Sequence, residues 1–170
     1  MKRNIFVLTF IIIFYSTEAL SQDYPKRRAG LWQIDMKMEG IPGGFPIPKS
    51  FNCIDEKSDA KMMQMSQNVD SSQCSKNEMK KDGSNYIHKM ICKTPMGSID
   101  STAVLSGDFN SSYTITSTVK HDPPMMGMAE TKTVINSTHV GPCKPGQKPG
   151  DIIMDNGITM NVFDMPGAKP

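Results

Sequence analysis

Methionine and histidine are the side chains in this sequence whose grouping could support chemistry. The chain holds 15 methionines and three histidines, and His121 is followed by Met125, Met126 and Met128 in a proline-containing segment. Thioether sulfurs combined with an imidazole suit Cu(I), and thioethers stay available where thiols are lost to disulfides. Methionine is also a common filler of irregular core space. These four residues therefore indicate either a Cu(I) site or ordinary packing and loop surface.

Catalytic residue sets cannot be found in the sequence. His88, His121 and His139 fall on different predicted elements, and no carboxylate stands at a spacing typical of a metal site or a triad. The sequence also has no HExxH, GxSxG or glycine-rich phosphate motif. We therefore expect a protein that is not an enzyme, with no catalytic residue and no cofactor apart from the copper alternative.

The N-terminus is typical of a cleavable secretory signal. Two basic residues precede an uncharged segment, residues 5–15, which is shorter than the roughly 20 apolar residues of a bilayer span. Small residues at the expected spacing predict cleavage between Ser21 and Gln22. We expect residues 1–21 to be removed and the mature chain to be periplasmic or secreted, with no transmembrane segment.

The charge of the mature chain argues against nucleic acid as a partner. Loss of residues 1–21 lowers the formal net charge from +2 to +1, whereas phosphate-binding surfaces carry a clustered basic excess. The one dense basic cluster is Lys26, Arg27 and Arg28. We interpret residues 22–29 as a flexible, solvated basic segment, with contact to an anionic membrane surface as the alternative.

The sequence contains four cysteines, Cys53, Cys74, Cys92 and Cys143. An even count in an exported chain predicts two disulfides, for which three pairings exist. Residues 81–84 are typical of a hairpin tip, and a three-residue loop there would place Cys74 opposite Cys92, leaving Cys53 for Cys143. A two-residue loop would shift the register by one residue and break that match, so the other two pairings stay open.

Short strands and one helix must position these side chains. Residues 31–38 alternate between apolar and polar side chains, the period of a half-buried strand, and a second strand is expected at residues 50–53. A helix is predicted over residues 55–65, capped by its first residue, with Ala60 and Met63 facing inward.

From Cys74 onward the sequence predicts successive hairpins rich in β-branched residues. A proline-rich loop is expected at residues 121–124, and an Asn-Gly pair predicts a turn within residues 152–162. The total is seven to nine strands. The further strands are expected at residues 75–81, 85–92, 98–106, 111–120 and 130–140.

This pattern indicates a mainly β fold, an antiparallel meander that forms a barrel-like or strongly curved sheet with one short helix and two disulfides. A barrel is favoured because closure hides the edge strands that a meander otherwise exposes. We expect a single β-rich domain over residues 30–165 and a short tail at residues 166–170.

Trp32 is the candidate ligand-binding residue. It lies in Gly30-Leu31-Trp32 at the start of the first predicted strand, which resembles the Gly-x-Trp segment that opens lipocalin-type barrels. That resemblance implies that Trp32 closes one end of a barrel whose interior binds an apolar ligand. The alternative is that Trp32 is simply a core aromatic residue.

The order of several short segments carries a second resemblance. Ala29-Gly30-Leu31-Trp32-Gln33 opens the domain, Cys53-Ile54-Asp55 precedes the helix, and Gly141-Pro142-Cys143 follows the last long strand. With Cys74-Ser75-Lys76, this arrangement resembles the bacterial family of exported proteins catalogued as domain of unknown function 3617. Membership implies an exported, β-rich protein with paired cysteines, and no activity or catalytic residue.

Together these patterns favour a non-enzymatic periplasmic β domain that binds a small apolar ligand or an envelope partner. A methionine-based Cu(I)-binding protein is the first alternative, and a structural or protein-interaction module is the second. The three differ in what they require of the fold, because only a ligand-binding protein needs an apolar cavity and only a copper protein needs His121 close to the methionines.

Overall fold

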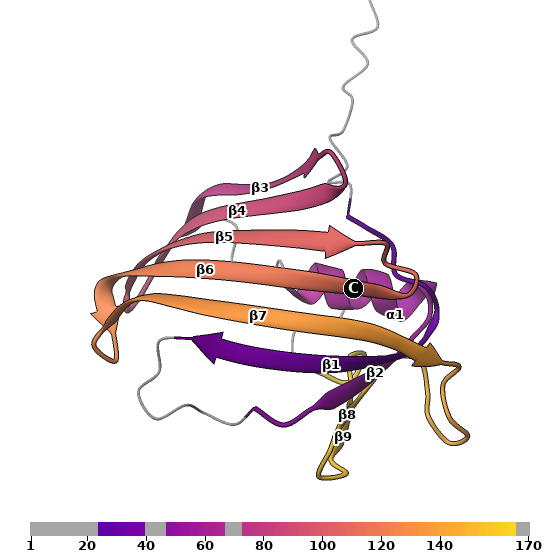
Figure 1. The fold of residues 1–170 in the computed structure, drawn as a ribbon. Helices are drawn as coiled ribbons and strands as arrows, with labels where there is room; N and C mark the ends of the chain where they lie inside the picture. Colours follow the sequence, from indigo (N-terminus) through magenta and orange to yellow (C-terminus); the bar gives the residue numbers. More distant parts are fainter. Residues whose placement is uncertain (1–23, 40–46, 67–72, 166–170) are drawn as a thin grey trace, which may run out of the picture.

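The computed structural model describes residues 24–39, 47–66 and 73–165. These residues form one antiparallel sheet of nine strands and a single helix (Figure 1). No helix in this part of the chain is long and apolar enough to cross a membrane. The predicted signal peptide, its cleavage site and the tail at 166–170 lie outside the described residues.

The strands hydrogen-bond in the order β3-β4-β5-β6-β7-β1-β2-β8-β9, and the sheet curves without closing, so that β3 and β9 are its edges (Figure 1). The predicted strongly curved antiparallel sheet is confirmed. The strands are β1 (Gly30–Glu39), β2 (Ser50–Ile54), β3 (Cys74–Asp82), β4 (Asn85–Thr94), β5 (Gly97–Gly107), β6 (Ser112–Met125), β7 (Met128–Gly141), β8 (Asp151–Met154) and β9 (Thr159–Asn161).

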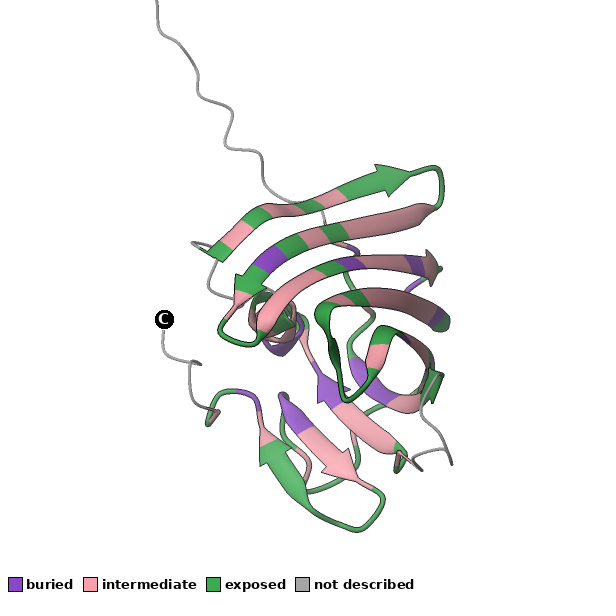
Figure 2. Cartoon of the chain, turned by 90° about the vertical axis from the view of Figure 1, so that its left-hand side faces the viewer, coloured by how far each residue is buried: buried purple, intermediate pink, exposed green. Residues whose placement is uncertain are grey.

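The helix α1 (Glu56–Ser66) lies on the concave side of the curved sheet (Figure 2). Its predicted cap is confirmed, because the Asp55 carboxylate accepts a 2.8 Å bond from the Ser58 amide while the Ser58 hydroxyl accepts one from the Asp55 amide. The bonds that the Asp55 carboxylate accepts from the Ser58 amide and hydroxyl lower its pKa. The predicted inward position of Ala60 is wrong. Ala60 is exposed, because Ser58 and Asp59 occupy the buried face of the first turn.

The turn between β5 and β6 carries an aromatic residue into the core. The Asp108 carboxylate accepts bonds from the Ser111 hydroxyl and from the backbone amides of Ser111, Asn110 and Ser112, which hold its pKa far below the ordinary range. Phe109 adopts a left-handed conformation with φ of 56° and is only 6% exposed. The loop therefore closes the concave side of the sheet at this end.

The proline-rich loop predicted at residues 121–124 is instead the end of β6. The pairing with β5 ends at Ser98 and Asp122, and the register with β7 is irregular between Lys120 and Met125. Prolines lack an amide hydrogen and are tolerated where ladder bonds are absent. The turn therefore forms later, at Met126 and Gly127.

Both predicted disulfides are confirmed, Cys53 with Cys143 and Cys74 with Cys92. The three-residue loop that was predicted to align Cys74 with Cys92 does not form, however. The turn has two residues, Gly83 and Ser84, and an irregularity just after Cys74 restores the match. A bulge in β3 thus compensates for the one-residue shift that the shorter turn produces.

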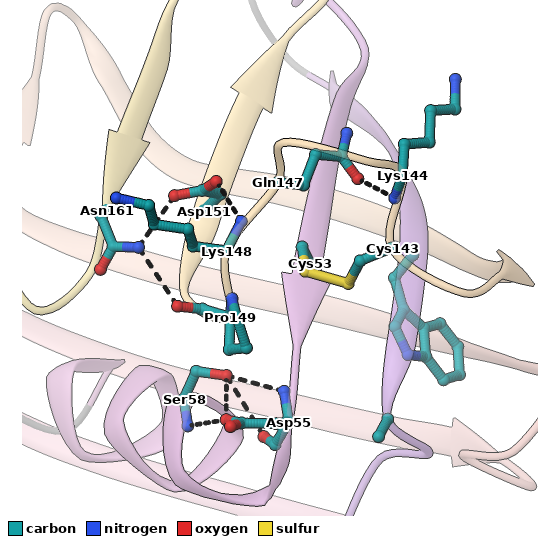
Figure 3. The surroundings of a disulfide bond; sticks show 12 residues. Cys53, Asp55, Ser58, Cys143, Lys144, Gln147, Lys148, Pro149, Asp151 and Asn161 are labelled. Atoms are coloured by element: carbon teal, nitrogen blue, oxygen red, sulfur yellow. Dashed lines mark hydrogen bonds between the residues drawn. A yellow bond between two sulfur atoms is a disulfide. The ribbon is translucent and has the colours of Figure 1, made fainter.

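The Cys53–Cys143 disulfide attaches β2 to the segment that follows β7, and a network of bonds continues toward β8 and β9 (Figure 3). The Gly150 amide donates to the Cys53 carbonyl at 2.8 Å. Asp151 accepts a 2.7 Å bond from the Lys148 amide and a 2.8 Å bond from the Asn161 side chain. The disulfide and these hydrogen bonds therefore hold the segment that leads into β8 and β9 against β2.

The hydrophobic core is formed by side chains of β1, β2, β5 and β6 and of the β5–β6 turn, with Met62 of α1 packed against it. Its fully buried members include Trp32, whose ring centroid lies 5.2 Å from that of Tyr113. Met62 and Met79 pack against this core, so methionine supplies volume that leucine usually supplies. The buried core residues are Trp32, Ile54, Leu105, Phe109 and Tyr113.

Candidate functional site

A cavity of about 270 Å³ lies between α1 and the concave face of the sheet, and we call it the helix cavity. Its walls come from the segment before β1, from α1, and from strands β3 to β6. Most of its lining is aliphatic, aromatic or thioether. The lining residues are Tyr24, Arg27, Met62, Met63, Ser66, Met79, His88, Ala103, Leu105, Phe109, Tyr113 and Ile115.

A buried ion pair forms one wall of the helix cavity. Arg27 Nε donates to Asp59 Oδ1 at 2.6 Å, and the Arg27 amide donates to Asp59 Oδ2 at 3.0 Å. Each side chain is 8% exposed. Arg27 Nη1 also donates to the Tyr113 hydroxyl at 3.0 Å. The expectation of a fully solvated basic segment is therefore wrong for Arg27, although neighbouring Lys26 is 82% exposed.

The charges around the helix cavity balance. Burial opposes the charged form of Arg27, but Tyr113 and Asp59 outweigh it, so the pKa of Arg27 is raised. Burial lowers the pKa of His88, whose Nε2 lies 2.7 Å from the Asn77 side-chain oxygen. His88 is thus favoured in its neutral form, and Asp59 neutralises Arg27, the one cation among the described lining residues. The cavity can accept an uncharged, mainly apolar molecule.

Trp32 lies in the core and is not part of the cavity lining. It is fully buried, packs against Tyr113, and meets His139 edge-on at 5.4 Å. Its Nε1 donates to the Arg28 carbonyl at 2.8 Å, and the Arg28 amide donates to Phe109 at 2.9 Å. Trp32 therefore positions the segment that carries Arg27 into the cavity wall.

A second hollow, which we call the methionine pocket, has a volume of about 340 Å³ and lies at the opposite end of β6. Its lining includes His121, Met125 and Met126, three of the four residues of the copper alternative, together with Met96 from the turn between β4 and β5. Met128 faces Met125 across the hairpin but does not line the pocket. The other lining residues are Thr94, Gly97, Ser98, Ile99, Pro123 and Pro124.

The remaining histidine contacts are separate from one another. His121 Nε2 lies 3.0 Å from the Thr131 hydroxyl, and His139 Nε2 lies 3.1 Å from the Ala29 carbonyl. Within the described ranges, no group of three or more His, Cys, Asp or Glu side chains is placed to hold a metal ion.

Sequence reasoning missed the residues that matter most in both hollows. Arg27 was assigned to a solvated basic run and Asp59 to no role, because a sequence does not show which face of a short helix is buried. Met96 was not connected with His121, since the pairing of β5 with β6 brings them together. The excess of methionine over leucine was the one feature of the sequence that related to both the helix cavity and the methionine pocket.

Searches of curated proteins and of solved structures found no match. A family model described as protein of unknown function (DUF3617) matches residues 27–143. The matched region begins at Arg27 of the buried ion pair and ends at Cys143 of the second disulfide. Because the match covers more than half of the sequence, the chain belongs to the DUF3617 family.

Proposed function

We propose that this protein is a non-enzymatic domain of the periplasm that binds a small apolar ligand in the helix cavity. The observation that carries the proposal is the lining of that cavity, whose described residues are largely apolar and include one cation, Arg27, which Asp59 neutralises. Ligand sites are typically apolar hollows with a few polar groups that orient the ligand. Arg27 and Ser66 are polar groups of this kind in the lining.

The size and composition of the cavity narrow the ligand class. A volume of about 270 Å³ is near the lower end of the ~300–1,000 Å³ range of small-molecule pockets. Met62, Met63 and Met79 contribute flexible side chains that can adapt to an alkyl chain or a ring. The balanced charge favours a neutral amphiphile over a fatty-acid carboxylate, because Asp59 already occupies the guanidinium of Arg27.

Two further observations support the non-enzymatic, extracytoplasmic part of the proposal. The hydrogen bonds of His88, His121 and His139 described above go to an amide, a hydroxyl and a backbone carbonyl, so these bonds assemble no acid–base pair. All four cysteines are paired, which is usual outside the cytoplasm. The N-terminal signal pattern agrees with that compartment.

A cavity-filling variant tests the proposal. The probe is a neutral phenyl-naphthylamine fluorophore, whose emission rises in apolar surroundings, titrated into the mature protein. We expect saturable binding of one probe per chain to the wild type, with a change in the emission of the single tryptophan, Trp32, because it packs on Tyr113 of the lining. Ala103→Leu should weaken binding at least about tenfold, since the added side chain takes up cavity volume.

The matched control is Ala129→Leu, the same change at an exposed position of β7. It should bind the probe as the wild type does. Circular dichroism spectra must be the same for all three proteins before affinities are compared. Equal probe binding by the wild type and Ala103→Leu would exclude the helix cavity as the site, and no saturable binding by the wild type would exclude the proposed function.

A further inference from the structure

We propose that the methionine pocket is a Cu(I) site formed by the thioethers of Met96, Met125 and Met126 and the imidazole of His121. These four side chains line one hollow of about 340 Å³, although they come from two different turns of the sheet and from β6. Three thioether sulfurs and one imidazole nitrogen form a neutral, soft donor set of the kind that Cu(I) prefers.

The pairing of β5 with β6 explains why the four side chains meet. Ser98 pairs with Asp122, which brings the β4–β5 turn onto the extension of β6, and both turns lie at the same end of the sheet (Figure 1). A Cβ atom at Gly97 would collide with the Asp122 carbonyl oxygen. The glycine therefore permits the close backbone contact that places Met96 beside His121 and Met125.

The exposure of these methionines distinguishes them from core residues. Met126 is 90% exposed, Met96 is 79% exposed and Met125 is 41% exposed. Met126 also has a φ of 52° at the β6–β7 turn, a left-handed conformation in which asparagine or glycine is preferred. A long apolar side chain at such a position is unfavourable for folding, which is consistent with a role in binding.

The surroundings of His121 leave one ring nitrogen for a metal. Its Nε2 lies 3.0 Å from the Thr131 hydroxyl, and Thr131 is 6% exposed. When that hydroxyl accepts the Nε2 hydrogen, the lone pair is on Nδ1, and the ring orientation is fixed. Metal-binding histidines commonly have their second nitrogen held by such a partner.

The charge of the pocket selects the class of ion. None of the described residues that line it is an aspartate, a glutamate, a lysine or an arginine. Calcium and magnesium need oxygen ligands, mainly carboxylates, and zinc prefers thiolate, imidazole and carboxylate. A soft monovalent cation, in contrast, needs no anionic ligand, so Cu(I) is the ion that this donor set fits.

The test is an anaerobic titration of the mature protein with Cu(I) alone, in competition with a chromogenic Cu(I) chelator. We expect the wild type to bind one equivalent, with X-ray absorption showing sulfur and nitrogen neighbours. The triple variant Met96→Leu, Met125→Leu and Met126→Leu should retain no copper against the chelator. Thr131→Val should weaken the affinity about 10–100-fold, because it removes the partner that orients His121.

The matched control is Met38→Leu with Met160→Leu, two methionines that are 37% and 41% exposed on β1 and β9. It should bind copper as the wild type does. Unfolding by urea shows whether each variant remains folded. Absence of stoichiometric binding in the wild type overturns the proposal, and so does equal binding by the wild type and the folded triple variant.

Discussion

The helix cavity and the methionine pocket contain the same types of side chain, but these are enclosed in the helix cavity and largely exposed to solvent in the methionine pocket. Each contains three methionines and one histidine among the residues described. In the helix cavity these side chains come from α1, β3 and β4, Arg27 of the buried pair with Asp59 lines the same cavity, and burial lowers the pKa of His88. In the methionine pocket, exposed turns carry Met96 and Met126, and a hydroxyl holds one nitrogen of His121.

This difference shows what decides the role of a methionine. Where the backbone encloses it, the thioether packs as a flexible hydrocarbon and leaves room for another apolar group. Where two turns present it to solvent next to an imidazole, its sulfur is the donor that remains accessible. The four predictions that follow test the comparison, from the largest expected effect to the smallest.

Asp59→Asn should destabilise the protein the most. It leaves the Arg27 guanidinium buried without its anion, and breaking a buried ion pair lowers the free energy of unfolding by about 3–5 kcal/mol. Urea unfolding measures the change. The control is Glu56→Gln, in the same helical turn as Asp59, which removes an exposed ion pair with Lys26. It should lower the free energy of unfolding by less than about 1 kcal/mol. Equal losses in both variants would show that burial of the pair is unimportant.

Met62→Ala should be more damaging than Met126→Ala. Met62 packs against the core and lines the helix cavity, so truncation should lower the unfolding free energy by about 2 kcal/mol or more. Met126 is 90% exposed, and its truncation should change stability by about 0.5 kcal/mol at most. The same urea experiment compares them. Similar effects of the two substitutions would contradict the division into packing and exposed methionines.

Met126→Asn should stabilise the fold while weakening Cu(I) binding. Asparagine tolerates the left-handed conformation of this turn position, and relief of that strain is worth about 1 kcal/mol. Thermal unfolding measures the expected gain in stability, and the chelator titration of the same preparation measures the expected loss of Cu(I) affinity. A lower melting temperature in Met126→Asn would mean that the turn does not disfavour methionine.

The smallest predicted effect is a pH-dependent contribution of His88 to the free energy of unfolding. Burial lowers its pKa below the ordinary value of 6.5, so on acidification the unfolded chain takes up this proton before the folded chain does. Stability is then fully present above about pH 6.5 and decreases below it until the lowered folded pKa is passed. Unfolding free energies of wild type and His88→Gln, measured from pH 7.5 to pH 5, should diverge in this window.

The aspartates with hydrogen-bonded carboxylates, Asp55 and Asp108, do not obscure that window. The pKa values of Asp55 and Asp108 are lowered from an ordinary value of 3.8 by hydrogen bonds to their carboxylates. Their contribution to stability is therefore present above that value and is lost only in more acidic solution. Parallel profiles of wild type and His88→Gln between pH 7.5 and pH 5 would show that burial of His88 has no energetic consequence.

Local patterns predicted much of the fold. The strand β1, the cap at Asp55 and the Asn-Gly turn after β8 are decided by residues close in sequence, and the structure contains all three. Burial along β1 does not alternate as predicted, because Leu31 and Trp32 are both buried and Met38 is exposed. The pairing of Cys74 with Cys92 was predicted through a turn that does not form. That success depended on a bulge, which the sequence does not indicate.

The sites were harder to predict because they depend on distant contacts. Arg27 becomes buried through Asp59 on the helix and Tyr113 on β6, two positions that no local pattern connects with it. His121, Met125 and Met126 could be grouped because they are close in sequence, whereas Met96 joins them only through the β5–β6 register. Proximity in the chain thus revealed three of the four proposed copper ligands, but neither member of the buried ion pair.

The position of β1 between β7 and β2 has a consequence for the order of folding. Strands β3 to β7 can form as consecutive hairpins with short loop closures, so the Cys74–Cys92 bond is within reach early. The pairing of β1 with β7 joins segments that are about a hundred residues apart in the chain. The Cys53–Cys143 bond likewise closes a separation of 90 residues. In oxidative refolding, we therefore expect a species with only the shorter disulfide to accumulate first.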